Sequence, residues 1–197
     1  MDGTLSTPVP TKTGLLVAVV GPSGVGKDSL IGAARAALSG STAVTFARRL
    51  ITRPADEAGE NHMPVSEQDF DRLQSSGAFA VSWDAHGLKY GVPATVLDDL
   101  AAGRIVVVNG SRSALGWFQQ AFPHLLVVSV TAKPEVLAAR LAARGRESRE
   151  EIEARLTRAV EPLPESFKVV TIDNSGPLEE GVEKLVSLLR ELQSAVA

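Results

Sequence analysis

A glycine-rich turn constrains the fold of this chain more than any other stretch. It reads Gly21-Pro22-Ser23-Gly24-Val25-Gly26-Lys27-Asp28-Ser29. Residues 15–20 before it are apolar, which predicts a buried parallel strand, and residues 29–38 after it are mostly good helix formers. The three glycines let successive backbone N–H groups point at one phosphate, and the helix N-terminus adds its dipole. Strand, glycine loop, Gly-Lys and helix together predict a P-loop, and a purely structural turn is the disfavoured alternative.

The residue after the lysine departs from the usual P-loop pattern. Lys27 is expected to reach the β- and γ-phosphates of ATP, and a Ser or Thr normally follows to bind Mg²⁺ together with a strand-end aspartate. Here Asp28 follows the lysine, and Asn109 ends the apolar strand 105–108. We hypothesise that the carboxylate has moved, so that Asp28 binds Mg²⁺ directly or through water. In the alternative, Asp28 only stabilises the helix N-terminus.

Composition excludes several classes of protein. With 197 residues, 44% of them hydrophobic, the chain is long enough for one domain over residues 14–197, after a Ser/Thr/Pro-rich tail (1–13) expected to be disordered. A net charge of −3 argues against nucleic acid as a partner, and the lack of cysteine excludes disulfides and thiol chemistry. Neither a signal peptide nor an apolar run of membrane-spanning length is found, so we expect a cytoplasmic protein without a membrane partner. The oligomeric state stays open, a homodimer included.

Strand-like and helix-like segments alternate along the chain. The further predicted strands are 42–46, 79–85, 88–92, 105–108, 125–130 and 169–172. The further predicted helices are one capped by Ser66 and closed by Gly77, then 93–102, 112–121, 134–144, 148–160 and 178–195, with a loop at 56–64. This alternation predicts an α/β fold with a parallel sheet covered on both faces, whose ligands lie beyond the carboxyl ends of the strands.

A basic segment downstream supplies candidate catalytic cations. Arg140 and Arg144 are four residues apart on one face of a predicted helix, and Arg155 lies beyond them. Phosphoryl transfer spreads negative charge over oxygens that a protein must neutralise, so we predict that Lys27 and these three arginines serve the transferred group. The alternative is a solvated helix with Glu–Arg pairs, because several glutamates lie nearby.

Several motifs together resemble the guanylate kinase family. They are 21–27, Thr52-Arg53, 65–70, the segment 87–91 with Tyr90, and 140–148. The resemblance implies a three-layer α/β/α P-loop fold with core segments 14–47 and 98–197, an acceptor-binding insertion at about 48–97 and an arginine lid at about 144–150. By position it also implies that Arg53 and Tyr90 hold the phosphate of the acceptor.

Four positions depart from that family. Guanylate kinases read the guanine ring with a glutamate where this chain has Val81 and with Ser or Thr where it has Val92. They also carry an arginine in place of Asp56 and an aspartate in place of Asn109. A buried base edge facing two valines would lose its partners, at a cost of about 1–3 kcal/mol for each missing hydrogen bond. These departures argue against a guanylate kinase.

A narrower resemblance is to the ribose 1,5-bisphosphate phosphokinases. It rests on residues 26–30, 51–53, 59–62, 82–92, 108–112 and 144–147, and so covers nearly the whole chain after the tail. It implies that the chain uses ATP to phosphorylate ribose 1,5-bisphosphate to 5-phospho-α-D-ribose 1-diphosphate, in phosphonate utilisation through carbon–phosphorus lyase. A nucleoside-monophosphate kinase and a non-catalytic guanylate-kinase-like binding module remain as alternatives.

An acceptor with two phosphates and no base needs cations and hydroxyl partners. The candidates are Arg48, Arg49, Arg53, Lys89 and Arg112 as cations, and Asn61, His62, Asp84 and His86 as ribose partners, with Tyr90 and Asn109 beside them. Arg48 has the alternative of a surface charge, and His86 that of a turn residue before Gly87. No general base is needed, because the 1-phosphate oxygen of the acceptor is already anionic.

Overall fold

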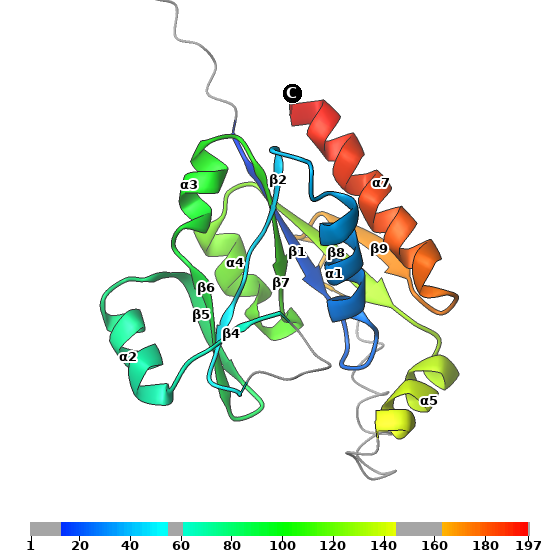
Figure 1. Cartoon of the computed structure of the whole chain (residues 1–197), viewed down its shortest axis with the longest axis horizontal. Coiled ribbons are helices and arrows are strands. Elements are labelled where there is room, and N and C mark those ends of the chain that lie inside the picture. The colour runs from blue at the N-terminus through cyan, green and yellow to red at the C-terminus, as the bar shows by residue number, and fades with distance from the viewer. Residues whose placement is uncertain (1–12, 55–60, 145–162, 197) are drawn as a thin grey trace, which may run out of the picture.

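The computed structural model describes residues 13–54, 61–144 and 163–196. Its centre is a five-stranded parallel sheet (Figure 1). In sheet order the strands are β2 (Val44–Phe46), β7 (Ile105–Asn109), β1 (Leu15–Val20), β8 (Leu125–Thr131) and β9 (Val169–Asp173). Each neighbouring pair runs parallel, as the alternation of strands and helices predicted.

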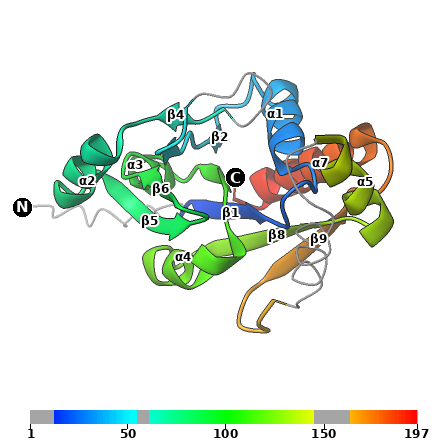
Figure 2. The same cartoon turned by 90° about the horizontal axis from the view of Figure 1, so that it is seen from below.

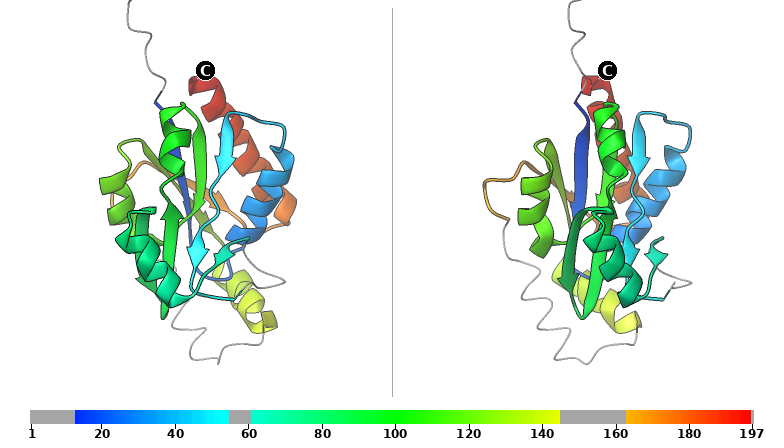
Figure 3. Two further views of the ribbon diagram at one scale, coloured as in Figure 1. Left: turned by 60° about the vertical axis from the view of Figure 1, so that its left-hand side comes forward. Right: turned by 90° about the vertical axis from the view of Figure 1, so that its left-hand side faces the viewer.

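Helices cover both faces of this sheet, because its central strands are apolar on both sides. In β1, Val17 and Val19 enter one hydrophobic cluster, whereas Leu16, Ala18 and Val20 enter the other. The covering helices are α1 (Lys27–Ala37), α5 (Pro134–Arg144) and α7 (Leu178–Val196) on the first cluster, and α3 (Val96–Ala101) and α4 (Leu115–Ala121) on the second. Figure 3 shows α1 and α7 on one side of the sheet and α4 on the other. This is the predicted three-layer arrangement.

Three helix starts differ from the prediction. Helix α1 begins at Lys27 rather than Ser29, since the left-handed Gly26 ends the loop there. A helix start at Pro93 is wrong, because Pro93 pairs with Phe79 at the end of a strand, where no N–H is needed, and α3 begins at Val96. The predicted helix 112–121 begins as a 3₁₀ turn, η1 (Arg112–Ala114), and the α-helix α4 starts only at Leu115.

A second, smaller sheet lies within residues 50–93. Its order is β4 (Met63–Pro64), β3 (Leu50–Ile51), β6 (Leu88–Pro93) and β5 (Phe79–Ala85), and α2 (Glu67–Ser75) packs on it. Ser66 caps α2 as predicted, since its Oγ accepts the Asp69 N–H at 3.0 Å. The strands β3 and β4 were not predicted, because two residues show no periodicity, and β4 lies within the predicted loop 56–64.

The small sheet joins the core through aromatic packing. Trp83 of β5 lies with its ring centroid 5.7 Å from that of Phe118 in α4, and both rings are buried in the second cluster. Figure 2 looks at the end where β1 enters the glycine loop, with the small sheet on one side and α5 on the other. No helix in the described part of the chain is both long and apolar enough to cross a membrane. The predicted tail before residue 13, the lid after Arg144, Asp56, Arg155 and the helix 148–160 lie outside the described residues.

Candidate active site

All three glycines of the loop between β1 and α1 have a positive φ, and a Cβ on Gly26 or Gly21 would also meet polar atoms at short distance. Gly26 has φ of +96°, and a Cβ there would lie 2.6 Å from Asn174 Nδ2. A Cβ on Gly21 would lie 2.4 Å from the Val130 carbonyl oxygen of β8. The Lys27 ammonium lies over the loop, where it donates to the carbonyls of Gly21 at 2.7 Å and Pro22 at 3.1 Å. The sequence thus specifies a tight loop whose lysine folds back onto its first two carbonyls.

Two side chains donate hydrogen bonds to the Val25 carbonyl of the loop. Asn174, just after β9, is 2% exposed and donates from Nδ2 to the Val25 carbonyl at 2.7 Å. Arg140 of α5 donates to the Asn174 carbonyl at 2.9 Å and approaches the Val25 carbonyl at 3.4 Å. Arg140 was predicted as a catalytic cation, whereas Asn174 was missed. The only sequence signal for Asn174 was its place at the carboxyl end of a strand.

The other two predicted arginines are less completely placed. Arg144 is the last residue of α5, one helical turn beyond Arg140. Arg155 lies outside the described residues.

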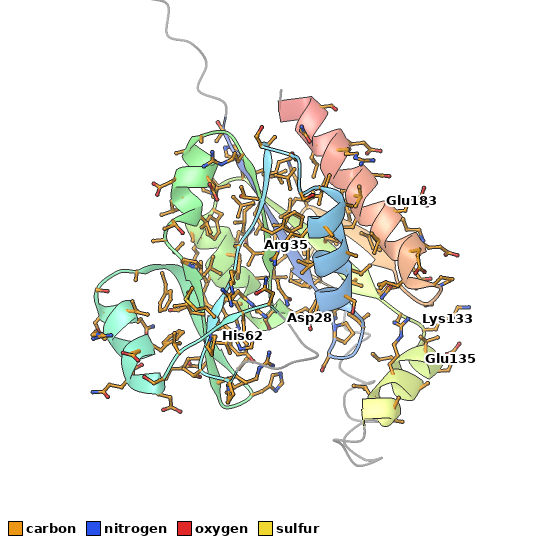
Figure 4. All side chains as sticks on the ribbon, in the orientation of Figure 1. Asp28, Arg35, His62, Lys133, Glu135 and Glu183 are labelled. Carbon is orange, nitrogen blue, oxygen red and sulfur yellow. The ribbon has the colours of Figure 1, made fainter. Side chains whose placement is uncertain are left out.

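Asp28 and Asn109 meet at the start of α1. The Asn109 Nδ2 donates to the Asp28 Oδ1 at 2.7 Å, although one residue begins a helix and the other ends β7. Asn109 is 7% exposed, and its Oδ1 is buried without a hydrogen-bond partner among the described residues. Asp28 itself is exposed, and Figure 4 shows it at the lower end of α1. The described residues contain no group of three or more His, Cys, Asp and Glu side chains that could hold a metal.

A cation on two stacked rings marks one face of the small sheet. Trp83 and Tyr90 are cross-strand neighbours whose rings stack at 5.3 Å with an interplanar angle of 7°. The Arg49 guanidinium carbon lies 5.2 Å from the Tyr90 centroid and 5.5 Å from the Trp83 centroid. Arg49 is 6% exposed, so the rings hold a nearly buried guanidinium in a fixed position.

His62 links the chain segments of Arg48 and Arg53 by hydrogen bonds. Its buried ring donates from Nε2 to the Arg53 carbonyl at 3.1 Å, and its own carbonyl accepts from Arg48 Nη2 at 2.9 Å. Asn61 beside it is exposed. Figure 4 shows His62 beside the small sheet, at the same lower end of the molecule as Asp28.

Other predicted acceptor residues lie elsewhere. Asp84 and Lys89 pair across β5 and β6 but alternate with Trp83 and Tyr90, so they occupy the opposite face of the small sheet. There Lys89 Nζ contacts Asp71 of α2 at 2.5 Å, and this hydrogen bond raises the pKa of Lys89. The structure therefore does not bring Asp84 and Lys89 to the face of Arg49.

His86 and Arg112 complete the set of predicted residues. His86 is exposed, with φ of +54°, and precedes Gly87 (φ +72°) in the two-residue turn between β5 and β6. These dihedrals are typical of a hairpin turn, which gives His86 a structural reason to be there. Arg112 is half-buried in η1, three residues after Asn109 and thus at the carboxyl end of β7.

The two valines that stand where guanylate kinases read the base are closed by packing. Val81 and Val92 are cross-strand partners, 6% and 0% exposed, in the same cluster as Trp83. The described structure leaves no polar group on this pair for a base edge.

Comparison with known proteins adds a family. Residues 17–160 match the AAA domain family. The chain is 52% identical over 183 residues to the ribose 1,5-bisphosphate phosphokinase PhnN of Rhizobium etli, covering 93% of each chain. It is 51% identical over 176 residues to that of Agrobacterium fabrum, covering 89% of this chain and 96% of the other. It is also 51% identical over 177 residues to a bifunctional ribose 1,5-bisphosphokinase-thymidine phosphorylase of Azorhizobium caulinodans, of which it covers 26%.

Solved structures support the fold. The guanylate kinase of Anaplasma phagocytophilum superposes with a TM-score of 0.67 at 19% identity, over 92% of this chain and 87% of the other. A gluconokinase of Sinorhizobium meliloti superposes with a TM-score of 0.52 at 20% identity, over 93% of this chain and 95% of the other. At such identities the likeness concerns the fold alone.

Proposed function

The chain belongs to the AAA domain family of P-loop proteins and, within it, to the ribose 1,5-bisphosphate phosphokinases, and from this premise we propose that it transfers the γ-phosphoryl group of ATP to ribose 1,5-bisphosphate. The products are ADP and 5-phospho-α-D-ribose 1-diphosphate. The observation that supports this most strongly is the breadth of the match, 52% identity over 93% of the chain, which includes both the glycine loop and the small sheet.

The transfer replaces one P–O bond by another. The bond from the γ-phosphorus to the bridging oxygen breaks, and its electron pair leaves with ADP. A new bond forms from the γ-phosphorus to an oxygen of the C1 phosphate, which is anionic at neutral pH and has no proton to lose. The protein therefore acts by position and charge, which is the usual pattern for phosphoryl transfer.

We assign the nucleotide side of this reaction to the glycine loop and its neighbours. The backbone N–H groups of residues 21–29, Pro22 excepted, would surround the phosphates, and the Lys27 ammonium would bind the β- and γ-phosphates. Arg140 donates to the carbonyls of Val25 and Asn174, which helps to hold the loop in place and adds positive charge beside it. Arg144 and Arg155 are proposed to neutralise the transferred group.

The chain also offers oxygen donors that fit Mg²⁺. Asp28 presents an exposed carboxylate, and the neighbouring Asn109 has a buried Oδ1 without a partner among the described residues. Mg²⁺ in kinase sites commonly takes one or two protein carboxylates and keeps nucleotide oxygens and waters. We propose that Asp28 is the protein ligand, directly or through water. The ion would neutralise charge on the phosphate oxygens.

For the acceptor we favour the face of the small sheet that carries Arg49 and Tyr90. Arg53 lies on the chain segment that leaves β3 and has its backbone fixed by His62. Two guanidinium groups suit two phosphates, because each can bind phosphate oxygens through a pair of N–H groups. Arg112 at the end of β7 and Asn61 near His62 are the further candidates. Asp84 and Lys89, on the other face, have the weakest claim.

We place this activity in the cytoplasm, where ATP is available, and in phosphonate utilisation. The alternative of a nucleoside-monophosphate kinase lacks polar partners for a base at Val81 and Val92. The alternative of a non-catalytic module disagrees with the intact glycine loop and its lysine.

Phosphorus NMR with ATP, Mg²⁺ and either ribose 1,5-bisphosphate or GMP tests the proposal. We expect diphosphate signals of the sugar product and ADP from the first acceptor, and no GDP from the second. Comparable GDP formation would support the monophosphate kinase, and no turnover with either acceptor would support the binding module. Lys27→Ala is the matched control, and it should abolish transfer while the chain stays folded.

A further inference from the structure

One hydrogen bond joins two residues far apart in sequence at the glycine loop. Asn109 and Asp28 are 81 positions apart, yet Nδ2 of the first donates to Oδ1 of the second at 2.7 Å. The contact ties the carboxyl end of the central strand β7 to the first turn of α1. It therefore lies where a P-loop protein holds the metal of its nucleotide.

The pair carries a single negative charge. The common P-loop pattern has a neutral hydroxyl after the lysine and a carboxylate at the strand end. This chain has the carboxylate after the lysine, at Asp28, and a neutral amide at the strand end, at Asn109. An aspartate at 109 would set two carboxylates at hydrogen-bond distance, and their repulsion would drive one to bind a proton. A neutral residue at 109 thus matches an acid at 28.

A second observation points the same way. The Oδ1 of Asn109 is buried and has no hydrogen-bond partner among the described residues, although the Nδ2 of the same amide is bonded to Asp28. Asn109 is 7% exposed as a residue and its Oδ1 is itself buried, so this oxygen is not simply turned to bulk water. A buried polar atom of this kind needs a partner, and Mg²⁺ or one of its waters is a chemically suitable one.

We propose that Asp28 and Asn109 form one exchanged magnesium-binding pair, and this proposal rests on ATP with Mg²⁺ as the donor in the proposed function. Asp28 supplies the charged oxygen. Asn109 is a positioning residue that fixes the Asp28 carboxylate and offers its Oδ1 to the ion or its water. The two side chains are matched, so either change alone disturbs the metal site, whereas exchanging both restores it.

The test measures metal binding at equilibrium without the acceptor. Mn²⁺ is titrated into the full chain with a non-hydrolysable ATP analogue, and the free ion is followed by electron paramagnetic resonance. We expect Asp28→Ser and Asn109→Asp each to weaken Mn²⁺ binding at least about tenfold, the scale of support groups at metal sites. The double variant, Asp28→Ser with Asn109→Asp, should return to within about fivefold of the native chain.

The outcomes separate the two proposals. Native chain that fails to bind the analogue at all would contradict the proposed function. Native binding combined with unchanged Mn²⁺ affinity in Asp28→Ser would overturn the exchanged pair, and so would a double variant as weak as the singles. If the double variant does not fold, Asp28→Asn decides, because it keeps the shape of the side chain and removes the charge. It should lower Mn²⁺ affinity at least about tenfold, and unchanged affinity would overturn the pair. Analogue binding in EDTA should stay level or improve in Asp28→Ser and Asp28→Asn, since a negative charge beside the phosphates is removed.

Discussion

Gly26 carries two constraints at once. Its φ of +96° strains any other residue, and a Cβ would collide with Asn174 Nδ2, the group that holds the Val25 carbonyl. We therefore expect Gly26→Ala to lower the free energy of unfolding by about 1–3 kcal/mol and to weaken ATP binding at least about tenfold, or 1.4 kcal/mol. Urea unfolding and equilibrium titration with an ATP analogue measure the two effects.

Gly32→Ala is the matched control for that substitution. Gly32 lies inside α1, and a Cβ there would meet nothing within 4 Å. Alanine in a helix interior is favoured over glycine, so this variant should gain up to about 1 kcal/mol and bind ATP normally. Equal behaviour of the two alanine variants would contradict the account of the loop.

Asp173 makes stability near the glycine loop depend on pH. The Ser175 hydroxyl donates to the Asp173 carboxylate at 2.5 Å, and the Ser175 N–H donates at 3.0 Å, and these bonds lower the pKa of Asp173 from its usual 3.8. A lowered pKa in the folded state means that this stabilisation is complete above about pH 4 and is lost as pH falls through the folded value. Asn174, which supports Val25, lies between these two residues.

We predict that Asp173→Asn is less stable than the native chain at pH 6 and that the difference shrinks below pH 3.8, the usual pKa. Urea unfolding from pH 6 to pH 2.5 measures it, at about half-unit steps. Glu183→Gln removes an exposed carboxylate of α7 and controls for net charge (Figure 4). A stability difference independent of pH would assign the effect of Asp173→Asn to shape rather than charge.

Among the elements, the small sheet makes a test of faces possible. Arg49 and Lys89 are both cations of this sheet, yet Arg49 lies on the stacked rings and Lys89 contacts α2. We predict that Arg49→Met lowers kcat/KM for ribose 1,5-bisphosphate at least about 100-fold, near 2.7 kcal/mol of transition-state stabilisation. Lys89→Met should stay within about twofold, since its charge is exposed and paired on the other face.

Steady-state rates measured over a series of ribose 1,5-bisphosphate concentrations give kcat/KM for both variants. Thermal unfolding checks that each variant is folded. A large loss in Lys89→Met with a small one in Arg49→Met would reverse the assignment of faces. A loss of stability without a change in kcat/KM would make Arg49 a packing residue.

Element types were predictable where the pattern was long. The strand before Gly21, the capped helix after Ser66 and the hairpin around Gly87 follow from periodicity and turn residues. The two-residue strands β3 and β4 were not, because they exist only through pairing with each other and with β6. Asn174 was missed for the same kind of reason: its bond to Val25 spans 149 positions, and no local pattern encodes it.

At the scale of the whole molecule, one apolar cluster packs the small sheet against the core. This packing limits which acceptors the fold can bind. Val81, Val92 and Trp83 of the small sheet pack with Phe118 and with Val106 of the core. The backbone of this chain thus matches the structure of a guanylate kinase at a TM-score of 0.67. Val81 and Val92, which stand at the base-reading positions of guanylate kinases, are nevertheless part of the interior here. Restoring polar residues there amounts to a core substitution.

We therefore predict that Val81→Glu, alone or with Val92→Ser, produces no GMP kinase activity. It should instead destabilise the chain by several kcal/mol, because an unpaired carboxylate would be buried against Trp83. Ser82→Glu is the control, since Ser82 is the next residue of β5, half-exposed, on the α2 side. It should change stability by less than about 1 kcal/mol. Urea unfolding and phosphorus NMR with GMP measure the two outcomes. A stable Val81→Glu chain that makes GDP would show instead that the packed contact between the sheets opens to admit a base. It would also show that these two side chains choose the acceptor, rather than Arg49 on the neighbouring rings.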